Sequence, residues 1–241
     1  MDNGIYIALS RQNALFRNLS VAANNLANVS TSGYNAQKLM FSSHLSNDNN
    51  NRKDAYANDA TSYRDTSNGA MKTTNNPFDL AISGPGYFLV ETPFGTRYTK
   101  SGNFQVNAEG TLISTQGYPV LGNDNGRITI PENANRVVIN GVGEISVDGN
   151  DVGQVGVVEF RNEQAMERIG DTLYNTTQQP QPAEKARILQ GAIESSNVSA
   201  ITELIHVQEI SRSVGSTAKF IETMYDLQRR VATAYSRPLQ A

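Results

Sequence analysis

The sequence predicts an α+β fold, with paired N- and C-terminal helices that pack like a coiled coil and a β-rich middle domain, either an antiparallel sandwich or a partial barrel. Two observations predict it. Near both ends of the chain, apolar residues recur at alternating spacings of about four and three, the pattern of helix-on-helix packing. Between the ends, short runs of alternating apolar and polar residues are separated by turn-forming glycine and asparagine, the pattern of antiparallel strands.

The first predicted helix covers residues 3–28. Asparagines near its end and the Ser-Thr-Ser-Gly run that follows tolerate the left-handed conformation that ends a helix. Its apolar stripe, interrupted only by Gln12, consists of Ile5, Leu9, Gln12, Phe16, Leu19, Ala23 and Leu26. A second row lies beside it and either widens the intramolecular stripe or contacts neighbouring molecules. This row consists of Ala8, Leu15, Ala22 and Val29.

The last predicted helix has Asn197 or Ser199 as its N-cap and ends near residue 236, before Pro238. Gly215 lies in its middle, where a glycine costs about 1 kcal/mol relative to alanine, so we expect a bend or a close helix contact there. The stripe of this helix consists of Val207, Ile210, Val214, Thr217, Ile221, Met224, Gln228, Val231 and Tyr235.

The middle of the chain begins with a polar stretch and continues with strands. Residues 42–76 contain few apolar side chains, so we expect a disordered linker or a segment extended against a partner. Two hairpins are expected after it, and a short helix and an extended Pro-containing linker complete the middle domain. The expected hairpins pair 87–91 with 96–99 and 103–106 with 111–114, further strands are 127–130, 136–139, 144–147, 156–160 and 186–194, the helix is 162–169 and the linker is 176–182.

These elements predict four parts of the chain. The first and last parts carry the terminal helices and would form one core domain together, whereas the middle two are a linker and an outer domain. The parts are 1–41, the first helix and the loop after it; 42–76, the polar linker; 77–194, the β-rich domain; and 195–241, the last helix.

Composition excludes several classes of partner. With 20 Lys and Arg against 23 Asp and Glu, no basic surface is expected, so neither nucleic acid nor anionic lipid is a predicted partner. No apolar run approaches the roughly 18 residues that a membrane span needs. The chain has no cysteine, which excludes disulfides and thiolate metal sites. Its first residues lack the basic and apolar regions of a secretion signal, so we expect no cleaved signal peptide.

Candidate chemical sites are weak, and we expect no catalytic, cofactor-binding or metal-binding residue. Residues 148–159 resemble a calcium loop, but Val152 offers no oxygen where a ligand is required, so a hairpin turn at Asp148-Gly149 is favoured. His44 and His206 are the only histidines and are too far apart in the sequence to suggest a metal site. An enzyme is therefore not expected.

One segment resembles a known family. Residues 23–34 read Ala-Asn-Asn-Leu-Ala-Asn-Val-Ser-Thr-Ser-Gly-Tyr, which is similar to the N-terminal signature of the axial family of bacterial flagellar rod and hook proteins. Ser30 and Tyr34 depart from it mildly, since Asn and Phe are common there. The residues assigned to the signature are Asn24, Asn25, Leu26, Ala27, Asn28, Thr31, Gly33 and Tyr34. Further similar blocks are 76–88, 98–104, 117–122 and 190–198, and length and residues 127–175 are most similar to the proximal-rod type.

The resemblance implies a structural subunit of the flagellar basal-body proximal rod. It would lie across the periplasm, polymerise helically through its terminal helices, and transmit motor torque. Its partners would be other copies, neighbouring proximal and distal rod subunits, and the flagellar type III export apparatus. Asn24, Asn25 and Asn28 would either end the helix or form amide ladders between subunits. We expect the terminal helices to be partly unfolded before assembly.

Two alternatives stay open. Within the family, the chain would be a distal-rod or hook-type axial subunit. From a different class, a soluble periplasmic binding module or glycan-acting module would need a concave site lined by carboxylates. The candidate carboxylates Asp79, Glu91 and Glu109 are scattered in the sequence, which disfavours that alternative.

Overall fold

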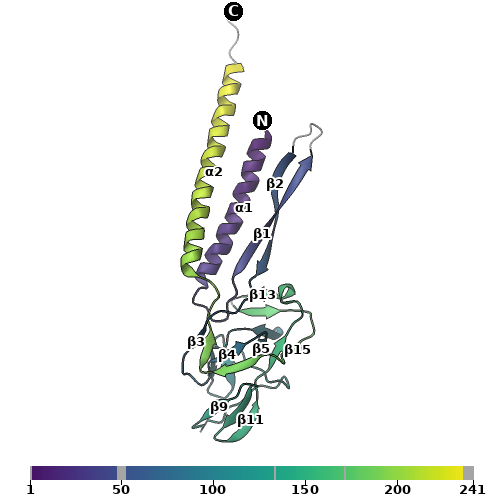
Figure 1. The fold of residues 1–241 in the computed structure, drawn as a ribbon, viewed down its shortest axis with the longest axis vertical. Coiled ribbons are helices and arrows are strands. Elements are labelled where there is room, and N and C mark those ends of the chain that lie inside the picture. The colour runs from purple at the N-terminus through teal and green to yellow at the C-terminus, as the bar shows by residue number, and fades with distance from the viewer. Residues whose placement is uncertain (1, 48–52, 133, 171, 236–241) are drawn as a thin grey trace, which may run out of the picture. The chain divides into compact units, whose positions relative to one another are not determined.

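The computed structural model describes residues 2–47, 53–132, 134–170 and 172–235, and its chain forms two compact units (Figure 1). Unit 1 comprises Met1–Ala27, Gln37–Tyr63 and Ser199–Ala241, and unit 2 comprises Asn28–Ala36 and Arg64–Val198. The prediction of a helix near each terminus and a β-rich middle with antiparallel sheets is confirmed. Pro238, the predicted helix stop, lies outside the described residues.

Unit 1 contains two helices and a two-stranded sheet. Helix α1 spans Asp2–Ala27 and helix α2 spans Ala200–Tyr235, and the two lie side by side (Figure 1). They run in opposite directions, because the start of α1 at Gly4 faces Met224, whereas Asn25 near its end contacts Glu203. Ser199 precedes α2 and its carbonyl accepts the first helical hydrogen bond, from the Glu203 amide, at 3.0 Å. Neither helix, within its described residues, has the apolar stretch that crossing a membrane requires.

The two helices differ in how their predicted stripes are buried. From Val207 to Val231, the stripe of α2 is its less exposed side, with Ile210 and Thr217 buried. On α1 the buried side is rotated relative to the stripe, since Ala8 and Ala22 are buried while Leu9 and Phe16 remain 48% and 49% exposed. Small side chains at a helix contact permit a close approach of the two axes, which favours burial of Ala8 and Ala22 at the contact.

The segment expected to be a polar linker is largely strand. β1 spans Gln37–Asn47 and β2 spans Lys53–Arg64, and they pair with each other. Residues 48–51 of the asparagine-rich run lie outside the described residues. A polar composition is compatible with this pairing, because backbone hydrogen bonding between strands does not require apolar side chains on both faces.

Unit 2 is built from short strands. The sequence predicted the two hairpins β5–β6 and β7–β8, whose registers pair Phe88 with Thr99 and Phe104 with Ser114. The strands are β3 Met71–Thr73, β4 Leu80–Ser83, β5 Tyr87–Thr92, β6 Gly95–Thr99, β7 Phe104–Val106, β8 Leu112–Ser114, β9 Val137–Ile139, β10 Glu144–Val147, β11 Asn150–Gln154, β12 Val157–Glu159, β13 Glu167–Ile169, β14 Leu173–Asn175, β15 Gln181–Pro182, β16 Arg187–Gln190 and β17 Ala192–Glu194.

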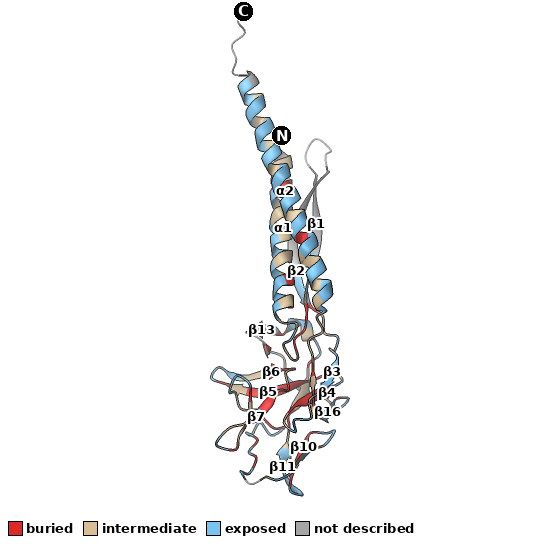
Figure 2. Ribbon diagram, turned by 90° about the vertical axis from the view of Figure 1, so that its left-hand side faces the viewer, coloured by how far each residue is buried: buried red, intermediate tan, exposed pale blue. Residues whose placement is uncertain are grey.

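Among the described residues, the largest sheet of unit 2 has the order β13-β14-β6-β5-β12-β15, and a smaller one has the order β11-β10-β9. β16 pairs with β4, and β17 with β3. Figure 2 shows the burial concentrated in β4 and β5, whereas the helices are mostly exposed. The core contains fully buried Leu80, Phe88, Val90 and Ile145, and a second cluster surrounds Tyr87 and Tyr174. The hydrophobic core of the chain therefore lies in unit 2.

Three local predictions were wrong or incomplete. Residues 162–169 form a 3₁₀ turn, Glu163–Ala165, and then strand β13 rather than a helix, because β14 pairs with that strand. The expected strand 186–194 is divided into β16 and β17 by Gly191, whose φ is 73°. The linker 176–182 ends in strand β15, which pairs with β12.

The hairpin turn predicted at Asp148 is confirmed. β10 pairs with β11 across it, and Asp148 and Gly149 both have positive φ, 50° and 89°, as such a tight turn requires. The Asp148 carboxylate accepts hydrogen bonds from the backbone amides of Asn135 and Arg136, at 3.1 and 3.0 Å. Its oxygens therefore serve the fold locally.

Gly215 does not make the close helix contact expected as one of its two possible roles. An added Cβ would meet no atom within 4 Å, and the residue is exposed in an uninterrupted α2. We therefore expect Gly215→Ala to stabilise the helix by about 1 kcal/mol, because alanine restricts the unfolded chain and adds no clash. Urea unfolding followed by far-UV circular dichroism measures this change, and a loss of stability would contradict the contact-free position of Gly215.

Candidate functional site

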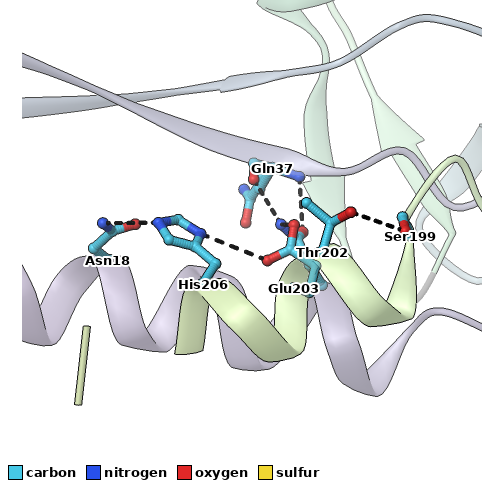
Figure 3. A network of polar contacts seen from close by, with 7 residues as sticks. Asn18, Gln37, Ser199, Thr202, Glu203 and His206 are labelled. Carbon is cyan, nitrogen blue, oxygen red and sulfur yellow. Dashed lines mark hydrogen bonds and ion pairs between the residues drawn. The ribbon is translucent and has the colours of Figure 1, made fainter. Parts of the chain in front are cut away.

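A network of polar contacts joins the two helices and β1 within unit 1 (Figure 3). Its centre is Asn25, which is 2% exposed. The side-chain amide of Asn25 donates to the carbonyl of Gln37 at 2.8 Å, and its oxygen accepts from the Gln37 backbone amide at 2.9 Å. The side chain thus copies the paired hydrogen bonds of a neighbouring strand and fixes the start of β1 to α1.

The same network reaches α2. Asn25 Nδ2 also donates to Glu203 Oε1, at 3.3 Å, and the other oxygen of Glu203 lies 3.8 Å from His206 Nδ1. His206 Nε2 lies 3.5 Å from Asn18 Nδ2 on α1 (Figure 3). Glu203 is close to the helix N-terminus, where the helix dipole favours a carboxylate. Polar contacts therefore align this end of the helix pair, where burial of apolar surface is limited.

The position of Asn25 bears on the two roles expected for the asparagines of the signature. Its amide is engaged inside the molecule, so it is not available for a ladder between subunits. Asn28 Oδ1 accepts a hydrogen bond from Thr31 Oγ1 at 3.2 Å, and the Thr31 amide donates to the Asn28 carbonyl, which matches the predicted helix end. The sequence identified these residues but not the partner Gln37, which lies beyond the turn.

The second half of the signature, residues 28–34, is fixed to strand β17 within unit 2. The Gly33 amide and the Ser32 hydroxyl both donate to the carbonyl of Glu194, at 2.8 and 2.9 Å. Gly33 has a φ of 68°, and an added Cβ would lie 2.4 Å from the Ser101 nitrogen. Glycine is therefore required here both by the backbone conformation and by the close approach of another backbone segment.

Tyr34 completes this anchoring. It is 2% exposed, and the guanidinium of Arg168 lies 4.2 Å from its ring centroid. Arg168 also donates to the carbonyl of Asn35 at 2.7 Å and to the hydroxyl of Tyr174 at 3.4 Å. A half-buried arginine between aromatic rings is stabilised by cation–π attraction. The aromatic residue of the signature is thus a core contact of unit 2.

Asn197 is a structural residue whose role was not predicted from the sequence. Its oxygen accepts from the Ala36 amide at 2.7 Å, and its Nδ2 donates to the carbonyls of Asp65 and Ser67, each at 2.9 Å. One side chain therefore joins three segments of unit 2 that are far apart in the sequence. The sequence suggested Asn197 as a helix cap, and only its place in the similar block 190–198 signalled further importance.

Buried charges lie close to this anchor. Glu194 is 2% exposed, and its carboxylate accepts from the Gly69 amide at 2.9 Å. Lys100, 3% exposed, donates to Asn68 Oδ1 at 3.1 Å and lies 5.6 Å from the Tyr87 ring centroid. Burial raises the pKa of the Glu194 carboxyl, although the charge of Lys100 and the Gly69 hydrogen bond act in the opposite direction.

The helices of unit 1 expose large apolar side chains. Ile201, Leu204 and Ile205, on the first turns of α2, are 73%, 54% and 53% exposed. Among the described residues of the helices, the other exposed large apolar side chains are Tyr6, Leu9, Phe16, Phe220, Tyr225 and Leu227. Of the predicted stripe residues, Ile5, Leu19, Leu26, Val207, Val214, Ile221, Met224 and Val231 are half-buried, Ile210 is buried, and Ala23 is exposed. Whether these residues form a subunit interface stays a prediction.

No arrangement for catalysis or metal binding emerges within the described part of the chain. No group of three or more His, Cys, Asp or Glu side chains there is placed to hold a metal ion. Glu91 pairs with Arg127, with 2.6 Å between Oε2 and Nε, and Asp79 is 7% exposed. His206 belongs to the helix network, and the side chain of His44 lies outside the described residues.

Removal of the Asn25 amide tests whether its hydrogen bonds to Gln37 hold β1 against α1. In Asn25→Ala we expect faster hydrogen exchange at the Gln37 amide and a loss of about 1–3 kcal/mol of stability, because the buried groups of Gln37 and Glu203 lose their partner. Asn13→Ala, at an exposed asparagine of the same helix, is the control. Unchanged protection of Gln37 in Asn25→Ala would show that other contacts hold β1.

The requirement for glycine in the signature is tested with two matched substitutions. Gly33→Ala and Gly117→Ala both place alanine at positive φ, 68° and 84°, but nothing lies within 4 Å of an added Cβ at Gly117. We expect Gly117→Ala to lose about 1–2 kcal/mol, the left-handed cost, and Gly33→Ala to lose clearly more, because of its clash. Equal losses of stability in the two variants, measured by thermal unfolding, would rule out the close approach of the Ser101 backbone to Gly33.

The raised pKa of Glu194 predicts a pH dependence of stability. The Glu194 carboxyl holds its proton more tightly in the folded state than in the unfolded state. The stability that this protonation contributes is fully present below the ordinary carboxyl pKa of 4.5 and is lost as pH rises through the higher folded pKa. Glu194→Gln removes this loss. We expect the free energy of unfolding of Glu194→Gln, taken relative to that of wild type, to increase between pH 4 and 7. A difference that does not change with pH would contradict the raised pKa of Glu194.

Comparisons with known proteins agree with this architecture. Residues 5–35 match the family model described as flagella basal body rod protein, and residues 81–147 match the flagellar hook protein FlgE/F/G D1 domain. The chain is 36% identical to the flagellar basal-body rod protein FlgF of Caulobacter vibrioides, over 95% of this chain and 96% of that protein.

Two further relatives cover nearly as much of the chain. FlgF of Rhizobium meliloti is 31% identical over 93% of this chain and 98% of its own length. The basal-body rod protein FlgG of Bacillus subtilis is also 31% identical, over 92% of this chain and 95% of its own. With its helical termini, its signature loop and its β-rich middle all matched, the chain belongs to the FlgF family of flagellar basal-body rod proteins and is a structural subunit of that rod.

Proposed function

We propose that the chain is a subunit of the proximal rod, that it polymerises helically through its terminal helices, and that it transmits motor torque across the periplasm. The observation that carries the proposal is the apolar surface of α1 and α2. These helices form one antiparallel pair, yet Leu9, Phe16 and Ile201 remain about half or more exposed. Large apolar surface on a soluble chain marks an interaction site.

Burial of these side chains in an assembly supplies the energy for polymerisation. Full burial of an exposed Leu, Ile or Phe side chain contributes about 1.5–3 kcal/mol. A few such residues per subunit are enough to offset the entropy of association. The stripe of α2 that faces α1 then forms a coiled-coil-like contact within the subunit. The exposed rows around that stripe form heterologous contacts between subunits, as a helical polymer requires.

The partners follow from that contact. We infer that they are other copies of the chain and neighbouring proximal and distal rod subunits. Export by the flagellar type III apparatus fits a chain whose helices are completed by their neighbours and are partly unfolded before assembly. The domain division proposed is 1–41 with 195–241 as the axial core, 42–76 as a polar extended linker and 77–194 as the outer domain.

A distal-rod position is the second candidate, and the similarity to FlgG of Bacillus subtilis favours it. The higher identity to FlgF of Caulobacter vibrioides supports the proximal position. Quantitative mass spectrometry of basal bodies arrested before distal-rod assembly separates the two. Presence of the chain there supports the proximal assignment, and its appearance only in later structures supports the distal one.

The assembly surface is tested with the exposed residues of α1. We expect Leu9→Glu and Phe16→Glu to leave the purified chain folded, because both side chains already contact water, but to abolish its incorporation into basal bodies and swimming motility. Asn13→Glu and Ser20→Glu, at exposed polar positions of the same helix, control for added charge. Circular dichroism checks the fold, and normal incorporation of both apolar-site variants would refute this surface.

A further inference from the structure

The most exposed large apolar side chain among the described residues belongs to unit 2. Phe94, at the turn between β5 and β6, is 83% exposed. Isolated exposed apolar residues are common on proteins, so exposure alone has little meaning. Two further features indicate that Phe94 is a binding residue: the turn that holds it and a groove elsewhere on the same unit.

The turn presents Phe94 in a fixed position. Pro93, directly before Phe94, has its own φ fixed by its ring, and Gly95, directly after Phe94, takes a φ of 95°. The Thr92 hydroxyl donates to the Gly95 carbonyl at 2.7 Å and accepts from the Phe94 amide at 3.3 Å. A side chain held on such a turn loses little entropy when it binds, which favours its use as an anchor.

The second feature is an apolar groove of about 520 Å³ on unit 2. It lies along β12 and β15 and the start of β16, and the turn at Gly141–Val142 borders it. Its apolar lining includes Leu89, Val142, Val155, Val157, Pro182 and Ile188. The volume is in the range of binding pockets for compact ligands, and an aromatic side chain buries about 150–250 Å² in such a site.

The edge strand beside the groove selects the kind of occupant. β15 is the last strand of its sheet, and it consists of Gln181 and Pro182, with Pro180 before it. Proline has no amide hydrogen, so this edge cannot accept a further strand along its length. The groove therefore suits an inserted side chain rather than strand addition.

Charges near the two features are complementary. The Arg97 guanidinium lies beside the turn, since its Nη1 is 3.7 Å from the position of an added Gly95 Cβ. Glu184, an exposed carboxylate, lines the groove. The other charged residue there, Arg187, directs its Nη1 at the carbonyls of Glu184 and Ala186. An incoming turn would thus place a cation near a carboxylate.

We propose that Phe94 of one copy inserts into this groove of the next copy, as a second contact between neighbouring rod subunits. The contact rests on the proposed function, because a turn and a groove formed by different residues of one chain make a heterologous pair, which repeats along a helical polymer. It requires no further partner, and the exposed aromatic residue is its central anchor.

Cysteine cross-linking tests the contact, because the chain has no cysteine of its own. A strain produces two single variants together, Phe94→Cys and Val142→Cys, at side chains 83% and 52% exposed, so that the fold is preserved. Basal bodies are isolated, oxidised with copper phenanthroline, and separated without reductant. We expect a disulfide-linked dimer at a yield at least tenfold above that of either variant alone.

The control mixture is Phe94→Cys with Val138→Cys, whose side chain is 39% exposed on β9 and does not line the groove. Equal dimer yields in both mixtures, or no dimer in basal bodies that contain the variants, would overturn the contact while leaving the rod assignment intact. Absence of the unmodified chain from basal bodies would instead overturn the proposed function, and this contact with it. Retention of motility in Phe94→Leu and its reduction in Phe94→Ser would support the anchor.

Discussion

The antiparallel packing of α1 against α2 is the contact on which the rest of unit 1 depends. Asn25 and Glu203, which hydrogen bond at one end of the pair, are 178 positions apart in the chain. Ala8 and Ala22 keep the contact close, and Asn25 uses its remaining hydrogen bonds to hold β1. The small residues that allow this approach bury little apolar area, so the pair is completed by polar contacts and leaves its bulky side chains outside.

The signature of the family is explained first by folding within the subunit. Asn25 replaces a strand partner for Gln37, Gly33 allows two backbone segments to meet, and Tyr34 is stacked under Arg168. Each role depends on a specific residue type, because an amide, an absent Cβ and an aromatic face are not interchangeable. The proposed assembly surface consists of other residues, chiefly Leu, Ile and Phe on the helices, whose only requirement is apolar area.

The sequence predicted the elements well where periodicity was strong and poorly where distant partners decide the structure. The helices and the hairpins β5–β6 and β7–β8 follow from local patterns. The burial of Ala8 instead of Leu9 depends on the approach of α2, and the strands β1 and β2 pair despite a polar composition. The roles of Asn25, Asn197 and Glu194 were not predictable, because their partners lie beyond any local pattern.

The anchoring of the signature loop has a consequence for the order of folding. Ser32 and the carbonyl of Glu194, which it contacts, are separated by 162 positions, and Asn25 and Glu203 by 178. A chain that becomes available from its N-terminus cannot close either contact until most of its length is free. Such distant pairings slow folding, since loop closure costs entropy before any contact forms. The contacts that hold the loop and the first helix therefore form late, after the local hairpins β5–β6 and β7–β8.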